Sequence, residues 1–406
     1  MRPGLERIQW LMERLGHPER AVPVVHVAGT NGKGSTSAMI AAALRGQGWK
    51  VGLYTSPDLG RINERVMIDG APLDEATWDR LADQVEAVGW DLPETPTFFE
   101  AVTALGFLAF REAGVDVAVL EVGLGGRLDA TNVVPNPRLT VITPVAYDHM
   151  DRLGNTIEAI AGEKAGILKP GAPLVLATQP YPAAARVIRE RAQALEVPVF
   201  SPRGQAEALG DRVRYQSPEG RAVEAALAGR YQAENLATAW TAVEVLHRLG
   251  FCPDLDAAAR ALRHVEWPGR FQVVSRRPLV VIDGAHNPHG VAALCDTLGQ
   301  PPWSRYQWQV VFAALQDKPG PAMAAQLAQV AAGLWVTEVP GERRTPATAL
   351  AAAVGATPVP DPMAAFQKAC DAARKREGTA VLVTGSLALL AWLRRAGAWN
   401  AGALGR

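Results

Sequence analysis

Short apolar runs alternate with longer segments of helical periodicity along the first two thirds of the chain. The apolar runs are the predicted strands, at 22–27, 51–54, 115–122, 139–143 and 174–177. The segments with helical spacing are the predicted helices, at 5–15, 35–47, 75–88, 99–112, 157–162, 182–195, 233–249 and 255–265. This alternation predicts an α/β domain with a central, mostly parallel sheet covered by helices on both faces.

A second series of strands and helices follows a break in this pattern. Its strands are predicted at 279–282, 309–314, 333–337 and 380–384. The break contains Pro268-Gly269, which interrupts the helical pattern, so we predict a hinge at 268-272 between domains at 1-267 and 273-406. The smaller C-terminal domain is Rossmann-like in its order of elements. No G-x-G-x-x-G follows its first strand, so we predict no dinucleotide site there.

The segment after the first predicted strand has the composition of a phosphate-binding loop. It reads Gly29-Thr30-Asn31-Gly32-Lys33-Gly34-Ser35 and leads into a predicted helix. Glycines let backbone N–H groups approach an oligophosphate, and the helix N-terminus adds a positive dipole end. Lys33 can reach the terminal phosphates and the Ser35 hydroxyl can hold magnesium, although the spacing is shorter than in the common P-loop. The alternative is an ordinary glycine-rich turn.

Polar residues follow two further strands of the predicted sheet. Glu121 ends one strand before a glycine-rich turn, and Asp148 and His149 follow the next. Because ligands bind at the carboxyl ends of strands in open α/β sheets, these side chains are expected beside the phosphate loop. A carboxylate there suits a phosphate-bound magnesium ion. The alternatives are a glutamate that caps a turn and a structural histidine.

Three more polar residues have weaker support from the residues alone. Asp283 and His286 follow the first strand of the second domain and are expected to project toward a cleft between the domains. The alternative is a tight Asp-Gly turn. Lys164, judged by composition, is a solvated lysine.

Composition excludes several classes of protein. Lys+Arg and Asp+Glu balance at 41 each, so the chain has no overall basic field for nucleic acid. Three widely spaced cysteines make neither a disulfide framework nor a zinc site, which suits a reducing cytoplasm. The first residues lack the apolar core of a signal peptide, and no uncharged apolar run is long enough to span a bilayer.

Together these segments resemble the folylpolyglutamate synthase/dihydrofolate synthase family within the wider Mur ligase group. The most specific match is Leu120-Glu121-Val122-Gly123-Leu124-Gly125-Gly126-Arg127-Leu128-Asp129-Ala130-Thr131-Asn132, which separates this family from the peptidoglycan ligases. Further matches lie at 54–57, 64–66, 97–100, 148–149, 163–167, 235, 268–271, 283–288 and 317–318. The resemblance implies a P-loop-type ATPase domain with a mostly parallel sheet, followed by a smaller Rossmann-like glutamate ligase domain.

The resemblance also implies roles for individual residues. ATP is expected to bind at Thr30, Asn31, Gly32, Lys33, Gly34, Ser35, Asn235, Arg270 and Asp283. Two magnesium ions (Mg2+) are expected at Ser35, Ser56, Glu121 and His149. The pteroate or folate pocket is expected at Thr97, Phe98, Phe99, Glu100, Leu128, Asp129 and Ala130. The catalytic residues are expected to be Lys33, Lys164 and His286, with Lys164 carbamylated by carbon dioxide.

Two features depart from the family pattern. Asp58 follows the Ser56-Pro57 pair, where relatives commonly have histidine. The matching region also begins almost at Gly4, whereas relatives carry a further upstream segment that helps to bind the pteridine. We therefore expect either a start downstream of the natural one or a more open pterin pocket.

The implied function is ATP-dependent amide-bond formation. The carboxylate of a folate or dihydropteroate takes the γ-phosphate to give an acyl phosphate, and the amine of L-glutamate then displaces phosphate. Whether the chain makes dihydrofolate, extends polyglutamate tails or does both stays open. The expected protein is a cytoplasmic monomer that binds these small molecules and neither nucleic acid nor a membrane. A Mur-type ligase with another acceptor and a nucleotide-hydrolysing switch are the alternatives.

Overall fold

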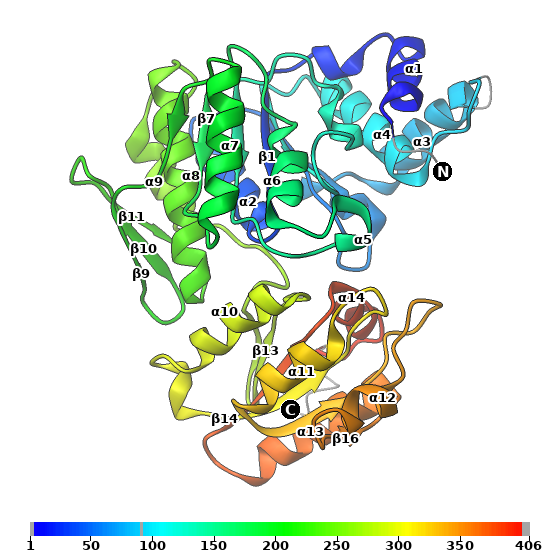
Figure 1. The fold of residues 1–406 in the computed structure, drawn as a ribbon, viewed down its shortest axis with the longest axis vertical. Coiled ribbons are helices and arrows are strands. Elements are labelled where there is room, and N and C mark those ends of the chain that lie inside the picture. Colours follow the sequence, from blue (N-terminus) through cyan, green and yellow to red (C-terminus); the bar gives the residue numbers. More distant parts are fainter. Residues whose placement is uncertain (1–3, 90–91, 400–406) are drawn as a thin grey trace.

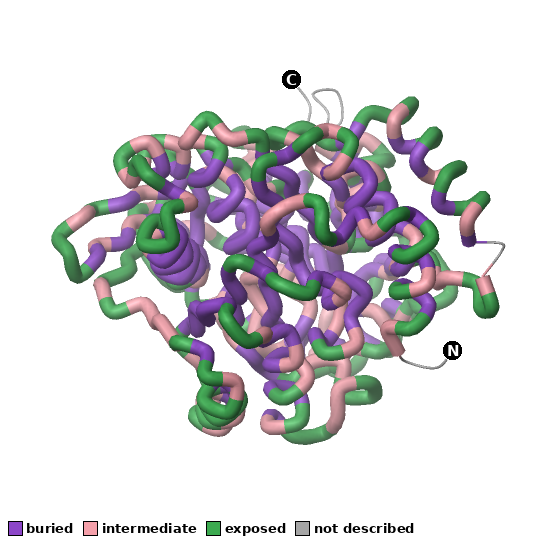
Figure 2. The backbone as a smooth tube through the Cα atoms, turned by 90° about the horizontal axis from the view of Figure 1, so that it is seen from above, coloured by how far each residue is buried: buried purple, intermediate pink, exposed green. Residues whose placement is uncertain are grey.

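Two α/β domains lie one above the other in a computed structural model that describes residues 4–89 and 92–399. The N-terminal domain runs from blue to green in Figure 1, and the C-terminal domain from yellow to red. Buried residues run through the interior of the molecule, with exposed residues along its outer loops and helix faces (Figure 2). No helix in the two described ranges is long and apolar enough to cross a membrane.

The N-terminal domain is built on an eight-stranded sheet with the order β4-β3-β2-β5-β1-β6-β7-β8. Its strands are β1 (Val24–Ala28), β2 (Val51–Tyr54), β3 (Val66–Ile68), β4 (Ala71–Pro72), β5 (Val117–Glu121), β6 (Leu139–Ile142), β7 (Leu174–Leu176) and β8 (Val199–Phe200). In this spatial order, neighbouring strands from β2 through β5, β1, β6 and β7 to β8 pair in parallel. At the other edge, β3 pairs antiparallel with both β2 and β4. Both faces of β1 and β5 are buried, which explains their apolar residues.

Helices cover both faces of this sheet. One face packs against α2 (Lys33–Arg45), α8 (Arg230–Arg248) and α9 (Leu255–Leu262). The opposite face packs against α1 (Glu6–Arg14), α3 (Glu75–Gly89), α4 (Phe98–Ala113), α6 (Ile157–Ala165) and α7 (Pro182–Ala194). A one-turn helix, α5 (Met150–Leu153), follows β6. The carboxyl ends of the central strands are thus left at one edge of the layers, toward the second domain (Figure 1).

A small antiparallel sheet extends the N-terminal domain and was not predicted. It consists of β9 (Gln205–Ala208), β10 (Val213–Gln216) and β11 (Ala222–Ala225) and packs against α8. All four residues of β9 are exposed, so this strand has no apolar side to give it a hydrophobic pattern.

The C-terminal domain has a six-stranded sheet with the order β12-β13-β17-β14-β15-β16. Its strands are β12 (Gln272–Arg276), β13 (Leu279–Ile282), β14 (Gln307–Phe312), β15 (Ala331–Val336), β16 (Thr357–Pro358) and β17 (Thr379–Thr384). One face shares a core with α10 (Pro288–Leu298), α11 (Gly320–Ala328) and α12 (Ala347–Ala352). The other shares a core with α13 (Pro362–Lys375) and α14 (Leu387–Arg395).

The predicted strands agree with the structure to within two residues at each end, and the predicted helices to within three. Hydrophobic pattern therefore located the buried parallel strands well. It did not reveal β12, which is partly exposed and pairs antiparallel with β13. Gln272, the last residue of the predicted hinge, is the first residue of β12.

Candidate active site

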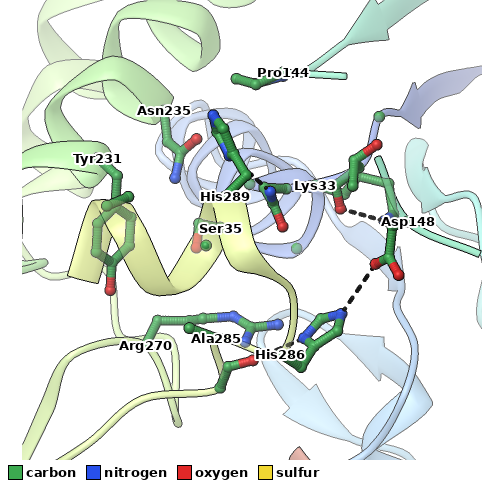
Figure 3. A pocket seen from close by; sticks show the side chains of 18 of the residues that line it. Lys33, Ser35, Pro144, Asp148, Tyr231, Asn235, Arg270, Ala285, His286 and His289 are labelled. Atoms are coloured by element: carbon green, nitrogen blue, oxygen red, sulfur yellow. Dashed lines mark hydrogen bonds and ion pairs between the residues drawn. The ribbon is translucent and has the colours of Figure 1, made fainter. Parts of the chain in front are cut away.

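Two adjoining cavities lie between the domains. The first, of about 480 Å³, is lined by the phosphate loop, the segments after β5 and β6, the start of α8 and the loop after β13. The second, of about 1410 Å³, is lined by the loop after β2, the turn after β5, α5 and C-terminal loops after β14, β15 and β17. Both are lined by Ser56, Pro57, Gly123, Leu124, His149, Leu153, His286 and Leu387. Figure 3 shows side chains from both domains around the first cavity.

The phosphate loop connects β1 to α2. Gly29 and Gly32 have φ angles of 145° and 85°, and a Cβ on Gly29 would overlap the chain just after β6. Such angles favour glycine, which explains its placement at both positions. The Thr30 hydroxyl donates to the carbonyl of Ala146 at 3.1 Å and fixes the loop to the segment after β6. Lys33 Nζ donates to the Thr30 carbonyl at 3.2 Å, so its charge lies over the loop.

Gln232, which sequence reasoning missed, joins two of the residues expected to bind ATP. Its Nε2 donates to Ser35 Oγ at 3.1 Å, and its Oε1 accepts from Asn235 Nδ2 at 2.9 Å. Asn235 also lies against Gly32, where an added Cβ would collide with its side chain. Gln232 and Asn235 are three positions apart on α8, and this helical spacing is the feature that could have indicated the pair.

Glu121 ends β5 as a buried carboxylate beside the phosphate loop. Its Oε2 accepts the Ser56 N–H at 3.3 Å, and a Cβ on Gly34 would lie 3.3 Å from the same oxygen. Burial raises the pKa of Glu121, and the positive charges of Lys33 and Arg270 oppose that rise. Glu121 is therefore under the influence of cations from the phosphate loop and from the start of the second domain.

Asp148 connects the two domains. Its carboxylate forms an ion pair with Lys318 and accepts from Asn287 Nδ2 at 3.0 Å, while His286 Nε2 lies 3.7 Å away (Figure 3). Burial by itself would raise the pKa of Asp148, but the charges of Lys318, His286 and His149 hold it well below its usual range. Sequence reasoning weighed Asp148 only weakly and gave Lys318 no role, although both lie in segments that carry the family resemblance.

His149 lies next to this ion pair with an uncommon backbone conformation. Its φ is 49°, a left-handed value that is rare for a residue with a side chain and typical of functional sites. Its Nε2 lies 3.2 Å from Lys318 Nζ. Burial lowers the pKa of His149, Asp148 opposes this, and the positive charges of Lys318 and Lys33 lower it further. His149 therefore tends to be neutral, which leaves a ring nitrogen able to bind a cation.

Asp283 organises the start of the second domain. Its Oδ2 accepts from the Tyr231 hydroxyl at 2.5 Å and from the Phe271 N–H at 2.8 Å, and its Oδ1 accepts from the Ala285 N–H at 2.8 Å. The last contact is the tight turn considered as the alternative role for Asp283. Burial raises the pKa of Asp283, while Tyr231 and Arg270 oppose the rise. Tyr231 is a further cavity residue that sequence reasoning missed.

His286 has a defined tautomer. Its Nδ1 lies 2.8 Å from the carbonyl of Gly284, which can only accept, so Nδ1 carries the proton and Nε2 has the free lone pair. Burial lowers the pKa of His286 to about 4, and the charge of Asp148 opposes this. The ring is therefore neutral at neutral pH and can accept a proton at Nε2.

Asn31 ties the phosphate loop to the second domain. Its amide and that of Asn287 are paired reciprocally, with nitrogen-to-oxygen distances of 2.9 and 3.2 Å. Asn31 Nδ2 also lies 2.9 Å from His289 Nδ1. Asn287 caps α10 by accepting from the Gly290 N–H. The loop and α10 are thus held in one arrangement across the cleft.

Lys164 lies buried behind the phosphate loop. Its Nζ donates to the carbonyl of Gly29 at 2.8 Å. Burial lowers the pKa of Lys164 to about 7, and the charge of Lys33 adds to the effect, while Asp148 opposes it. The interpretation from composition, a solvated lysine, is wrong because helical periodicity places this side chain on the inner face of α6.

The second cavity contains most residues expected in the pteroate or folate pocket. Those that line it are Thr97, Phe99, Glu100, Leu128, Asp129 and Ala130. Phe98 differs, because its side chain is 60% exposed and lies under Arg65 with the guanidinium 5.4 Å from the ring centre. Phe98, the first residue of α4, therefore points outward and does not line this cavity.

Two of these residues also hold the local structure. Glu100 completes a capping box with Thr97 at the start of α4 and accepts from Arg7 Nε at 3.1 Å. Asp129 accepts from the N–H groups of Thr131 and Leu124. Their carboxylates therefore shape the cavity wall.

Two family models match the chain. They are the Mur ligase middle domain over residues 27–243 and the Mur ligase, glutamate ligase domain over residues 269–387. Together with the two α/β domains and the cleft between them, these matches make the chain a member of the Mur ligase superfamily.

The comparisons with individual proteins are more specific. A Bacillus subtilis (strain 168) dihydrofolate synthase/folylpolyglutamate synthase is 42% identical over 346 residues, covering 82% of this chain and 80% of that protein. The Mycobacterium tuberculosis folylpolyglutamate synthase complexed with ADP and AMPPCP has a TM-score of 0.88 at 33% identity, covering 97% and 95%. Escherichia coli FolC in complex with DHPP and ADP has a TM-score of 0.85 at 31% identity, covering 98% and 93%. The chain belongs to the folylpolyglutamate synthase/dihydrofolate synthase family and is an ATP-dependent ligase.

Replacing Lys33 by alanine removes the cation of the phosphate loop. We expect turnover to fall by about 10²–10³-fold, the typical effect of losing one charge-stabilising group. The thermal midpoint should stay near the parent's, because the Lys33 side chain is only half-buried and bonds a carbonyl of its own loop. ADP release and thermal denaturation measure the two effects, with Lys368→Ala on the exposed side of α13 as control. A folded Lys33→Ala protein with near-parental turnover would contradict the ATP site.

Proposed function

We propose that this chain joins L-glutamate to the carboxylate of a folate or dihydropteroate at the expense of ATP. The observation that supports this is the junction of the two cavities at Ser56, His149 and His286. A carboxylate bound in the larger cavity can reach the phosphate loop through this junction. A single chain supplies both walls of the cleft, so we propose the monomer as the active unit. Its free cysteines suit a reducing cytoplasm, where we place the reaction.

The first step makes the acceptor carboxylate reactive. A carboxylate oxygen attacks the γ-phosphorus of ATP, the bond to the bridging oxygen breaks, and ADP leaves with the electron pair. The acyl phosphate that results carries a good leaving group, which the carboxylate lacks. Lys33 and Arg270 offset negative charge on the phosphates, and the aligned reactants contribute by proximity.

The second step forms the amide. The neutral amine of L-glutamate attacks the acyl carbon, phosphate leaves, and the nitrogen loses a proton. His286 is the residue we propose for this proton, because its neutral ring has a free lone pair at Nε2 beside the cavity junction. The nearby Asp148 carboxylate would stabilise the imidazolium that forms.

Magnesium is the ion that this donor set fits. Within residues 4–89 and 92–399, no group of three or more His, Cys, Asp or Glu side chains can hold a metal by itself. Mg2+ commonly takes one or two carboxylates together with substrate phosphates and water, so a complete protein cage is not needed. We propose that Ser35, Ser56, Glu121 and His149, which line the first cavity, hold two ions. Bound there, the ions would neutralise phosphate charge.

The larger cavity is the proposed acceptor site. It is lined by Thr97, Phe99, Glu100, Leu128, Asp129 and Ala130, which combine an aromatic face with fixed polar groups. One related structure, that of E. coli FolC, was solved with DHPP and ADP. Because the phosphate loop lies at the other end of the junction, a pterin held here would present its carboxylate toward ATP.

The coupling of hydrolysis to ligation tests the reaction. With ATP, magnesium and acceptor present, we expect ADP and phosphate release to depend on L-glutamate, because an acyl phosphate in a closed cleft waits for the amine. Product mass should rise by one glutamyl unit for each ATP consumed. A dihydropteroate and a reduced folate are both supplied, with mass spectrometry and ADP assay as readouts. Equal ADP release without glutamate, with no ligated product, would favour the nucleotide-hydrolysing switch. If neither pterin gives a ligated product, a Mur-type ligase with another acceptor would be favoured.

Replacing Glu121 by glutamine tests the magnesium proposal. The amide keeps the shape and the acceptor for the Ser56 N–H but removes the negative charge. We expect the magnesium concentration for half-maximal rate to rise by about 10–100-fold, the range found when groups around a metal site are changed. Glu112→Gln, an exposed carboxylate paired with Arg80, is the control. Superimposable magnesium titrations for parent and Glu121→Gln would rule out this ligand.

We also propose that Lys164 carries a carbamate. Its neutral amine attacks carbon dioxide, a proton is lost, and an anionic group forms behind the phosphate loop. The pKa of about 7 supports this, since the amine becomes neutral as pH rises through that value, whereas an exposed lysine stays charged.

Carbon-13 NMR with labelled bicarbonate measures the carbamate. We expect a carbamate resonance at mildly alkaline pH in the parent that weakens as pH falls below about 7, because protonation removes the reactive amine. Lys164→Met should lack the resonance and Lys368→Met should keep it. A resonance that survives in Lys164→Met, or none in the parent, contradicts the modification.

A further inference from the structure

The loop that carries Ser56 is tied at its base within the N-terminal domain. It spans residues 55–65 between β2 and β3, and we call it the Ser56 loop. The Thr55 N–H donates to the Arg65 carbonyl at 3.0 Å, and Asp58 forms an ion pair with Arg65 at 2.9 Å. Asp58 therefore closes the loop upon itself.

Residues of the second domain also contact the Ser56 loop. Arg394 on α14 donates through Nη1 to Glu64 Oε1 at 2.7 Å and to the Leu59 carbonyl at 3.3 Å. The other oxygen of Glu64 accepts the Leu59 N–H at 3.0 Å. The Leu59 side chain packs into the apolar core that α13 and α14 form with the C-terminal sheet. It also lies against the hinge, since a Cβ on Gly269 would be 3.0 Å from Leu59 Cδ1.

The contact with Arg394 lies close in sequence to Ser56, a residue that lines the cleft. Ser56, three positions before Leu59, donates its N–H to Glu121 Oε2 at 3.3 Å. At the other end of the contact, α14 begins at Leu387, which lines both cavities. One helix therefore lines the larger cavity along its length, from Leu387 to Arg395, and holds the Ser56 loop through Arg394 in its last turn.

We propose that Arg394 is a positioning residue that fastens the Ser56 loop to the C-terminal domain. Ser56 is then held beside Glu121 only while the two domains keep this arrangement. The contact of Arg394 with the Ser56 loop couples domain closure to the position of Ser56 in the proposed magnesium site. This coupling to catalysis rests on the proposed function. Among residues 4–89 and 92–399, the hydrogen-bond partners of Arg394 are Glu64 and Leu59, so Arg394 acts through the loop and not on a reacting group.

Substituting Arg394 should leave the fold intact. The side chain of Arg394 is 43% exposed and that of Glu64 is 18% exposed, so the Glu64 carboxylate keeps some access to water and still accepts the Leu59 N–H when the charge of Arg394 is removed. The test variants are Arg394→Gln, Glu64→Gln and both together, with Arg394→Lys as the conservative change. Arg80→Gln is the matched control, since Arg80 forms an exposed ion pair with Glu112 away from the cleft.

The first measurement is amide hydrogen exchange in peptides covering residues 55–61, which needs no catalytic activity. In Arg394→Gln we expect exchange about two- to fivefold faster, the effect of losing a partly exposed charged contact. The combined variant should exchange no faster than the faster single variant, because both changes remove the same contact. Arg394→Lys should restore part of the protection, and Arg80→Gln should match the parent.

The second measurement separates positioning from binding. In Arg394→Gln we expect the magnesium concentration for half-maximal rate to rise and kcat to fall, each by about two- to fivefold, with KM for ATP unchanged. Exchange and magnesium dependence that both match the parent's would overturn the proposal, as would equal changes in Arg80→Gln. If the parent ligates neither acceptor, the proposed function fails, and the exchange experiment still decides whether Arg394 holds the loop.

Discussion

The buried carboxylate of Asp148 is the interaction on which the cleft depends. It neutralises Lys318, whose side chain is only 6% exposed, and it accepts a hydrogen bond from Asn287 at the start of α10. A buried lysine without its counter-ion is strongly unfavourable, so this one group fixes three segments from two domains. Because its pKa is held below that of a free carboxylate, its contribution is present at neutral pH and is lost only as strong acid protonates it.

The topology makes this arrangement possible. The phosphate loop follows β1, Glu121 ends β5, Asp148 follows β6 and Asp283 follows β13, so four strand ends from two sheets face one cleft. The carboxyl ends of parallel strands lie at the same edge of a sheet. Neither domain alone has both the phosphate loop and Arg270. A site divided in this way is complete only when the domains meet, which suits the proposed reaction, whose acyl phosphate must be kept from water.

Sequence reasoning located the buried strands because both their faces need apolar residues. The strands at 51–54 and 279–282 have the predicted bounds, whereas β9 and β12 were missed because exposure removes the apolar pattern that reveals a strand. The small sheet of β9 to β11 packs against α8, the next element along the chain, and only its strand β10 alternates fully buried with half-buried residues. Most of the predicted strands are therefore fully buried ones, whose own apolar residues indicate that burial.

In the candidate site too, some side chains could be predicted from the sequence and others could not. Lys33, Ser35 and Glu121 could be picked out because phosphate and metal chemistry needs those residue types next to glycine-rich turns. Gln232 and Tyr231 were not picked out, because they act through partners 197 and 52 positions away. Only the helical spacing of Gln232 from Asn235 could have indicated the first of them. Lys164 lies between these cases: its family motif indicated a role, but its lowered pKa comes from burial behind the phosphate loop, which only the packed structure contains. The residue types that a reaction needs can be predicted where they lie in one segment. Their burial, their contacts and their pKa values depend on the whole fold.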